Sequence, residues 1–183
     1  TGFDQVGGSV RGTFAPTANA RFTAGYTRTN QDGADRYDQL LGGDGNLVSE
    51  LNGLSLDAGT ARMELLGGPL QYLTLTYGVN SQREERVNQG GQGSNTATLG
   101  HEPERTTSHS LSALTRRELS SRVSLGLGGD VQFERLVSDA FNINPVTGAR
   151  STRRPRVPSD ATFTQGGVYA QTTIAAVPDR LRL

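Results

Sequence analysis

The chain has 183 residues, no cysteine and equal numbers of acidic and basic side chains. This composition excludes disulfides and thiolate metal sites, and it argues against nucleic-acid binding, for which a basic excess is expected. Its 33% hydrophobic content and 24 glycines would give a soluble domain only a thin core, whereas a membrane β-barrel needs apolar residues only at alternate strand positions.

The N-terminal part of the chain predicts a hairpin of two amphipathic strands. It opens TGFDQVGGSV, without an initiator Met or a signal peptide, so we expect a mature product or a fragment. Apolar and polar residues alternate over residues 5–14, and the turn PTAN follows at residues 16–19. Alternation returns over residues 21–28. A polar, glycine-rich loop is then expected over about residues 31–53.

A second hairpin follows the same plan. Residues 54–66 form its first strand, the turn GGP lies at 67–69, and residues 71–79 return and run on into the charged sequence SQREER. The apolar positions change from even to odd within the first strand, which predicts a β-bulge near Gly59 or a longer preceding loop. A flexible loop is expected over about residues 87–104.

The third hairpin contains the strand with the strongest signal. Residues 105–116 and the turn ELSS at 118–121 lead into residues 122–137, RVSLGLGGDVQFERLV. Apolar side chains occupy most odd positions of that strand and small or polar ones the even positions, so one face is apolar and the other polar. Its length suits a tilted crossing of a hydrocarbon layer ~30 Å thick, whereas no stretch approaches the ~18 consecutive apolar residues of a membrane-spanning helix.

The C-terminal part predicts one more loop and two strands. The loop, about residues 138–160, contains three prolines, which exclude a continuous strand. A strand over residues 162–176, the turn VPDR at 177–180 and the start of a strand at 181–183 follow. All short turns then lie at one end of the sheet and all long loops at the other, as in outer-membrane barrels. We therefore predict an all-β, antiparallel up-and-down meander, with about seven to eight strands of a large transmembrane β-barrel.

Two groups of loop residues are candidates for ligand contact through charge. Arg36, Tyr37 and Asp38 in the first loop can hold an anionic or chelated ligand, although ordinary loop chemistry is an alternative. The third loop is locally basic, because it contains Arg150, Arg153, Arg154 and Arg156. These guanidinium groups suit an anionic siderophore or lipopolysaccharide phosphates, and a solvated loop balanced by nearby aspartates is the alternative.

The two histidines form a third candidate group. His101 and His109 flank PERTTS at the rim of the second loop, and imidazole is a common ligand of haem iron and metals. Their spacing matches no zinc motif, so solvated rim histidines are the alternative. The residues predicted to contact ligand are Arg36, Tyr37, Asp38, His101, His109, Arg153 and Arg154.

Catalytic motifs are missing from the sequence. It contains no GxSxG, HExxH or CxxC, and its glycine-rich stretches lack the lysine of a phosphate-binding loop. Ser108 and Ser110 adjoin His109, but neighbouring strand residues point to opposite faces, so they form no dyad with it within that strand. We expect no enzyme, no cofactor and no resident metal.

Two segments carry a resemblance to a known family. YTRTNQDGADRYDQL and PSDATFTQGGVYAQTTIAAVPDRLRL resemble strand and loop segments of TonB-dependent outer-membrane receptors. The resemblance implies a barrel of about 22 strands in the bacterial outer membrane. It also implies uptake of a scarce extracellular ligand, such as siderophore-bound iron, haem or cobalamin, with outer-membrane lipid and the TonB system as partners.

The same family has an N-terminal plug, a TonB-binding box and a terminal aromatic residue, none of which is found here. We therefore expect residues 1–183 to be one partial barrel domain, an internal section that folds as a curved open sheet with two free edges. The TonB system would act through the missing N-terminal part. The alternative is a small, self-contained outer-membrane barrel acting as an adhesin or structural anchor, in which the first and last strands pair.

Overall fold

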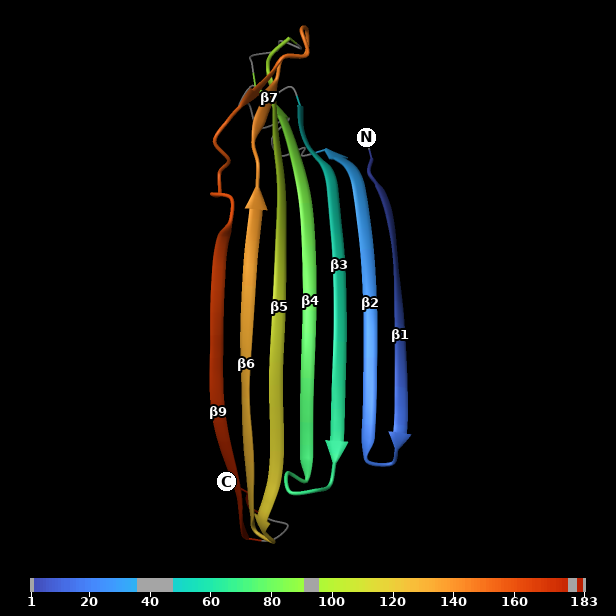
Figure 1. Ribbon diagram of the computed structural model, residues 1–183, viewed down its shortest axis with the longest axis vertical. Coiled ribbons are helices and arrows are strands. Elements are labelled where there is room, and N and C mark those ends of the chain that lie inside the picture. The colour runs from blue at the N-terminus through green and yellow to red at the C-terminus, as the bar shows by residue number, and fades with distance from the viewer. Residues whose placement is uncertain (1, 36–47, 91–95, 178–180, 183) are drawn as a thin grey trace.

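The computed structural model describes residues 2–35, 48–90, 96–177 and 181–182, and strands account for most of them. Eight strands follow one another in a single sheet in chain order, each antiparallel to the next (Figure 1). These strands are β1 (Asp4–Thr17), β2 (Ala20–Asp35), β3 (Val48–Leu66), β4 (Tyr72–Gln89), β5 (Leu99–Ser120), β6 (Val123–Ser138), β9 (Ala161–Val177) and β10 (Leu181–Arg182). The predicted all-β, up-and-down meander is confirmed.

The connections divide between the two ends of the sheet as predicted. The short turns between β1 and β2, β3 and β4, and β5 and β6 lie at one end, and the long connections lie at the other (Figure 1). The connection after β6 contains a small hairpin of its own, in which β7 (Phe141–Ile143) pairs with β5 and β8 (Arg150–Thr152) pairs with β7. No helix among the described residues is long and apolar enough to cross a membrane.

The strands extend further toward the long connections than the sequence indicated. The loop predicted over residues 87–104 is wrong, because β4 and β5 stay paired as far as Gln89 and Leu99. The extra pairs involve charged and polar residues, which show no apolar alternation. Backbone hydrogen bonds between antiparallel strands form regardless of side-chain type. The ends of β4 and β5 could therefore not be predicted from their polar composition.

The expected bulge near Gly59 is also wrong. Gly59 pairs in register with Tyr26 on one side and Val79 on the other. The irregularity in β3 lies between Leu51 and Gly53 instead. Strand β3 therefore keeps a single register through its middle, and the apolar residues of its first half lie on the opposite face from those of its second half.

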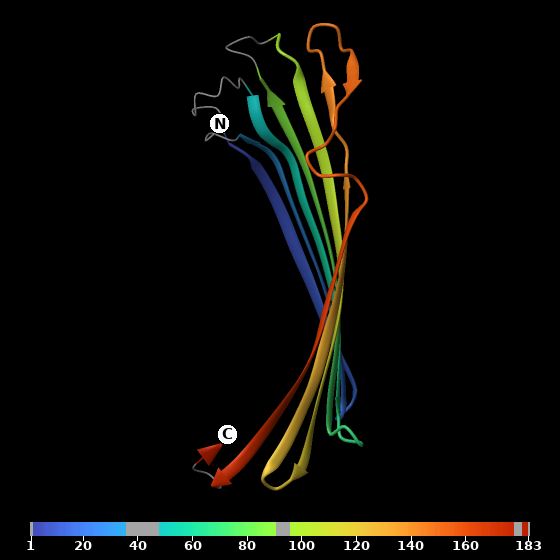
Figure 2. The same cartoon turned by 90° about the vertical axis from the view of Figure 1, so that its left-hand side faces the viewer.

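The sheet is a single twisted layer that stays open within the described residues. β1 pairs only with β2, and β10 pairs only with β9. Figure 2 shows how strongly the layer twists from one end to the other, as right-handed strand twist requires. Of the described apolar side chains, only Val87 and Ala140 are buried, so the chain has no enclosed core. Cross-strand pairs hold the layer together.

Candidate functional site

One face of the sheet carries a continuous apolar band. The strand registers place alternate residues of β1 to β6 and β9 on this face, because opposite residues of paired strands share a side. Many of these side chains are exposed, and Val168 is 92% exposed. The apolar band consists of Val10, Phe14, Phe22, Ala24, Tyr26, Ala61, Met63, Leu73, Leu75, Tyr77, Val79, Leu111, Ala113, Leu125, Leu127, Val131, Phe133, Val168, Ala170 and Ile174.

The opposite face is polar, and its side chains pair with one another across strands. Thr13 and Thr23 share a hydrogen bond of 3.2 Å, and the Gln165 Nε2 group donates to Gln132 Oε1 over 3.0 Å. Nearer the short turns, the Arg62 Nη2 group lies 2.9 Å from Glu64 Oε1. Such a surface is stable in contact with water, whereas the apolar band is not.

Charges gather on the polar face toward the long connections. Arg86 lies between two glutamates and contacts both, through its Nε atom to Glu84 and through Nη2 to Glu104 Oε2 at 3.0 Å. The Glu104 side chain is only 14% exposed. Partial burial strengthens such charge-assisted hydrogen bonds, so these three side chains have little freedom.

A second charged cluster fixes the connection between β6 and β9 to this end of the sheet. Each carboxylate oxygen of Glu102 takes one guanidinium group, since Arg153 Nη2 lies 2.5 Å from Oε1 and Arg156 Nε lies 3.0 Å from Oε2. The Glu102 side chain is 8% exposed. Gly100 leaves the space next to this cluster that Arg153 and Asn88 occupy, because a Cβ atom there would lie within 3.1 Å of both side chains. Two ion pairs to Glu102 on β5 therefore hold the third long connection in place, and the composition of the connection alone does not predict them.

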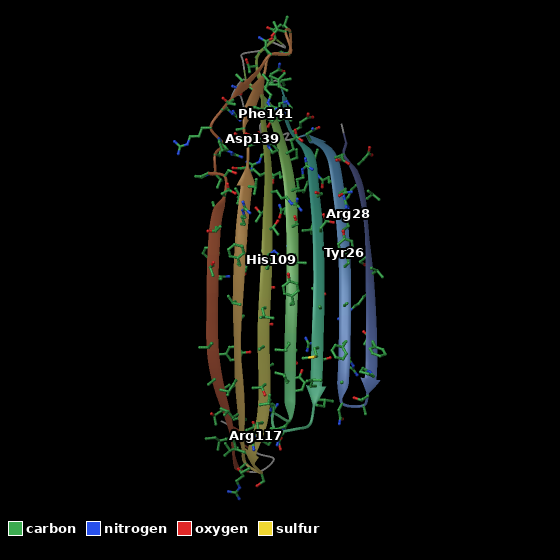
Figure 3. The ribbon with its side chains drawn as sticks, viewed as in Figure 1. Tyr26, Arg28, His109, Arg117, Asp139 and Phe141 are labelled. Atoms are coloured by element: carbon green, nitrogen blue, oxygen red, sulfur yellow. The ribbon has the colours of Figure 1, made fainter. Side chains whose placement is uncertain are left out.

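The other face at the same end holds a stacked group. The His101 ring lies parallel to Phe141, with centroids 5.0 Å apart, and the Arg150 guanidinium sits 3.6 Å above the Phe141 ring. His101 Nδ1 is 3.2 Å from Glu85 Oε1. Figure 3 shows Phe141 and Asp139 at this end, well beyond His109. His101 thus belongs to strand β5 and not to a flexible loop, which corrects its predicted position.

His109 also lies on β5, within the apolar band. Its Nδ1 atom is 2.7 Å from the Tyr77 hydroxyl, and it stands opposite Phe133 on the neighbouring strand. Eight residues of extended strand separate the two histidines by about 26 Å. The structure therefore does not bring His101 and His109 together, and they cannot ligate the same haem iron.

The remaining predicted ligand residues differ in their surroundings. Arg36, Tyr37 and Asp38 lie outside the described residues. Arg153 is tied to Glu102, whereas Arg154 is exposed and makes no ion pair with any described residue. Within the part of the chain that the structure describes, no three His, Asp or Glu side chains are grouped as metal ligands would be.

Sequence reasoning missed the glutamates and Arg86 that form the charged clusters. The signal was present in the stretches SQREER and HEPER, where positions 84, 86, 102 and 104 share the parity of one strand face. Their polar composition predicts loops or strand ends for these stretches, and the shared parity has no meaning outside a strand. Once β4 and β5 extend through them, the even residues must lie together on the polar face.

Sequence comparisons identify no relative, since no family model and no curated protein matches this chain. A solved structure does match. The chain superposes on the copper transporter OprC with a TM-score of 0.66 and 15% sequence identity. The likeness shows the fold. It includes 96% of this chain but only 26% of the OprC chain, so the present chain spans about a quarter of that transporter's length.

Proposed function

We propose that this chain is a section of a transport barrel in the bacterial outer membrane. The observation that carries the proposal is the contrast between the two faces of one long-stranded sheet. The strands are long enough for a tilted crossing of a hydrocarbon layer ~30 Å thick, since β1 has 14 residues and β5 has 22. The apolar band then faces lipid, and the polar face lines the interior.

The proposed cargo is a scarce extracellular nutrient. The resemblance of two segments to TonB-dependent receptors supports siderophore-bound iron or haem, and the likeness to a copper transporter adds copper. Uptake would be driven by the TonB system through parts of the protein outside this chain. The charged clusters around Arg86 and Glu102 lie at the long-connection end of the polar face, where cargo would enter.

Reconstitution of the complete protein tests the membrane assignment. We expect it to fold in lipid vesicles and to aggregate in buffer without detergent, because the apolar band has no cover other than lipid. A monomer that stays soluble and folded without detergent would overturn the proposal.

Growth of a deletion strain on limiting copper, ferric siderophore or haem identifies the cargo. Growth should depend on the protein only when the limiting nutrient is its cargo.

The orientation of the sheet yields a separate prediction. We expect cysteine at Thr147, in the long connection, to react with an impermeant maleimide on intact cells. Cysteine at Ala18, in the turn between β1 and β2, should react only after the outer membrane is opened, because short turns of such barrels face the periplasm. Labelling at Ala18 without labelling at Thr147 would reverse the assignment.

Arg154 is the proposed ligand contact among the described residues, because its charge is exposed and not engaged by a described carboxylate. We expect Arg154→Ala to raise the cargo concentration for half-maximal uptake by ~10-fold, since a hydrogen bond to a charged group contributes ~1.5 kcal/mol or more. The maximal rate should stay unchanged. The matched control is Arg122→Ala in the turn before β6, and an equal effect of both substitutions would contradict a specific contact.

A further inference from the structure

Two arginines face each other at the border of the apolar band. Arg83 on β4 and Arg105 on β5 are directly opposite partners in the antiparallel ladder. Directly opposed residues of such a ladder have Cβ atoms only ~5 Å apart, and like charges at that distance destabilise the pair of strands. Both side chains are exposed, and neither forms an ion pair with a described residue. The carboxylates of Glu85 and Asp57 lie on the same face but contact His101 and Arg28 instead.

The surroundings of this guanidinium pair suit an anion. The Arg105 Nε group donates to Ser81 Oγ over 3.0 Å, and Ser81 Oγ lies 3.5 Å from Thr107 Oγ1. Two further arginines lie on the same face, in the row of Ser81 and Thr107, and already have partners. Arg28 lies 3.7 Å from Asp57, and Arg135 lies 2.5 Å from Asp160. Arg83 and Arg105 therefore differ from Arg28 and Arg135 in having no carboxylate partner among the described residues.

The face and the level of the pair identify the kind of anion. Both arginines lie on the same face as the apolar band, and Arg83 is four residues beyond Val79 toward the long connections. Tyr26 and Arg28 show the same order on β2, with the aromatic ring at the edge of the band and the arginine just beyond it (Figure 3). In the proposed barrel this is the level of the lipid head groups on the outer surface.

The apolar band below provides room for acyl chains. The small residues Gly12, Ala24 and Ala61 lie side by side on adjacent strands, and Phe14, Phe22, Met63, Leu75, Tyr77 and Leu111 rise around them to form a shallow groove. The groove extends away from the guanidinium pair toward the short turns. A lipid can therefore place its chains over apolar side chains while its phosphate lies against the arginines.

We propose that Arg83 and Arg105 form a binding site for the phosphate group of an outer-leaflet lipid, on the outside of the barrel. The proposal rests on the proposed function, because it requires the apolar band to face lipid. A phosphate between the two guanidinium groups removes their repulsion and accepts charge-assisted hydrogen bonds from both. The hydroxyl groups of Ser81 and Thr107 can donate to its remaining oxygens.

The test uses the complete protein in detergent and measures its melting temperature during titration with lipid A, a phosphorylated glycolipid. We expect the double substitution Arg83→Gln and Arg105→Gln to weaken lipid A binding by at least ~10-fold. The control, Arg11→Gln with Arg116→Gln, removes the same charge from exposed positions on the polar face and should bind lipid A like the wild type. Equal binding by the Arg83 and Arg105 variant would overturn the proposal.

Two further arms separate the possible sources of phosphate. Dephosphorylated lipid A should bind the wild type weakly, with an affinity no higher than that of lipid A for the double variant. Inorganic phosphate at the same concentration should not raise the melting temperature of the wild type. A response to inorganic phosphate equal to that of lipid A would replace the lipid site with a free-phosphate site.

Without any lipid, the variant should melt no lower than the wild type, because the like-charge pair is gone. A lower melting temperature would instead show a structural role.

Failure of the lipid site is distinguishable from failure of the proposed function. A protein that inserts into vesicles but binds lipid A equally with and without the guanidinium pair contradicts only the lipid site. A protein that needs neither lipid nor detergent contradicts the transport barrel itself.

Discussion

Arginine in place of Leu127 should lower the free energy of unfolding of the complete protein in lipid vesicles by ~2 to 4 kcal/mol. Leu127 lies on β6 between Leu125 and Val131 of the apolar band, opposite Thr115 and Ala170 on the neighbouring strands. A guanidinium group there must leave water for hydrocarbon near the middle of the bilayer. Urea unfolding of the reconstituted protein, followed by the β-sheet signal in far-UV circular dichroism, measures the change in the free energy of unfolding.

The matched control is arginine at Gln132 on the same strand. Gln132 lies on the polar face, opposite Ser110, and is hydrogen-bonded to Gln165. Intrinsic strand propensity largely cancels between the two variants, because the same side chain is introduced into one strand. We expect a cost of less than ~1 kcal/mol at Gln132, the size of one neutral hydrogen bond. Equal costs at both positions would show that the two faces meet the same environment.

Glutamine in place of Glu102 should release the third long connection. The substitution keeps the shape of the side chain but removes the charge shared by Arg153 and Arg156, and Glu102 is the most buried partner in the cluster. Losing hydrogen bonds between charged groups costs ~1.5 to 3 kcal/mol, which raises the population of the open connection by ~10-fold or more. Trypsin cleavage after Arg153 or Arg156 in the folded protein should accelerate by that factor.

Glu134→Gln provides the control for this experiment. Glu134 is also on the polar face of the sheet, and it makes no ion pair with a described residue, so its loss of charge should leave the cleavage rate unchanged. If Glu102→Gln also left the rate unchanged, the connection would be held by its other contacts instead. These include the hydrogen bonds from Arg153 to the Ala140 carbonyl and from Ser138 to the Val157 carbonyl.

The meander was predictable because its signals are local. A turn such as PTAN and the alternation along residues 122–137 each identify their element without reference to the rest of the chain. The strand ends beyond the apolar band were not predictable in this way. Residues 81–89 and 99–104 are mostly charged, polar or glycine, and they form strands because their neighbours in the sheet continue alongside them.

The candidate site was less predictable than the fold, because its contacts join distant parts of the chain. Arg153 was expected to contact ligand, yet its partner is Glu102, 51 residues earlier, and only the position of the folded connection brings them together. The sequence predicts His101 and His109 at the rim of one loop, but both lie on β5, and eight residues of extended strand separate them. Spacing along the sequence gives a distance between side chains only when the intervening secondary structure is known.

The length of β5 determines how far from the cell surface cargo would first be met. Twenty-two residues at ~3.4 Å each give about 75 Å of strand, and a tilt of ~40° leaves a height of about 57 Å. The hydrocarbon layer takes ~30 Å of this height and one head-group layer ~6 Å. The end of β5 at Leu99 therefore stands roughly 20 Å clear of the lipid. Glu102, three residues short of that end, and Arg86, its partner on β4, stand roughly 13 Å clear. At roughly 13 Å, about one and a half Debye lengths at physiological salt, screening weakens the field of the membrane's own charged head groups. An ion that approaches the Arg86 and Glu102 clusters would respond more strongly to the charges of the protein than to those of the bilayer.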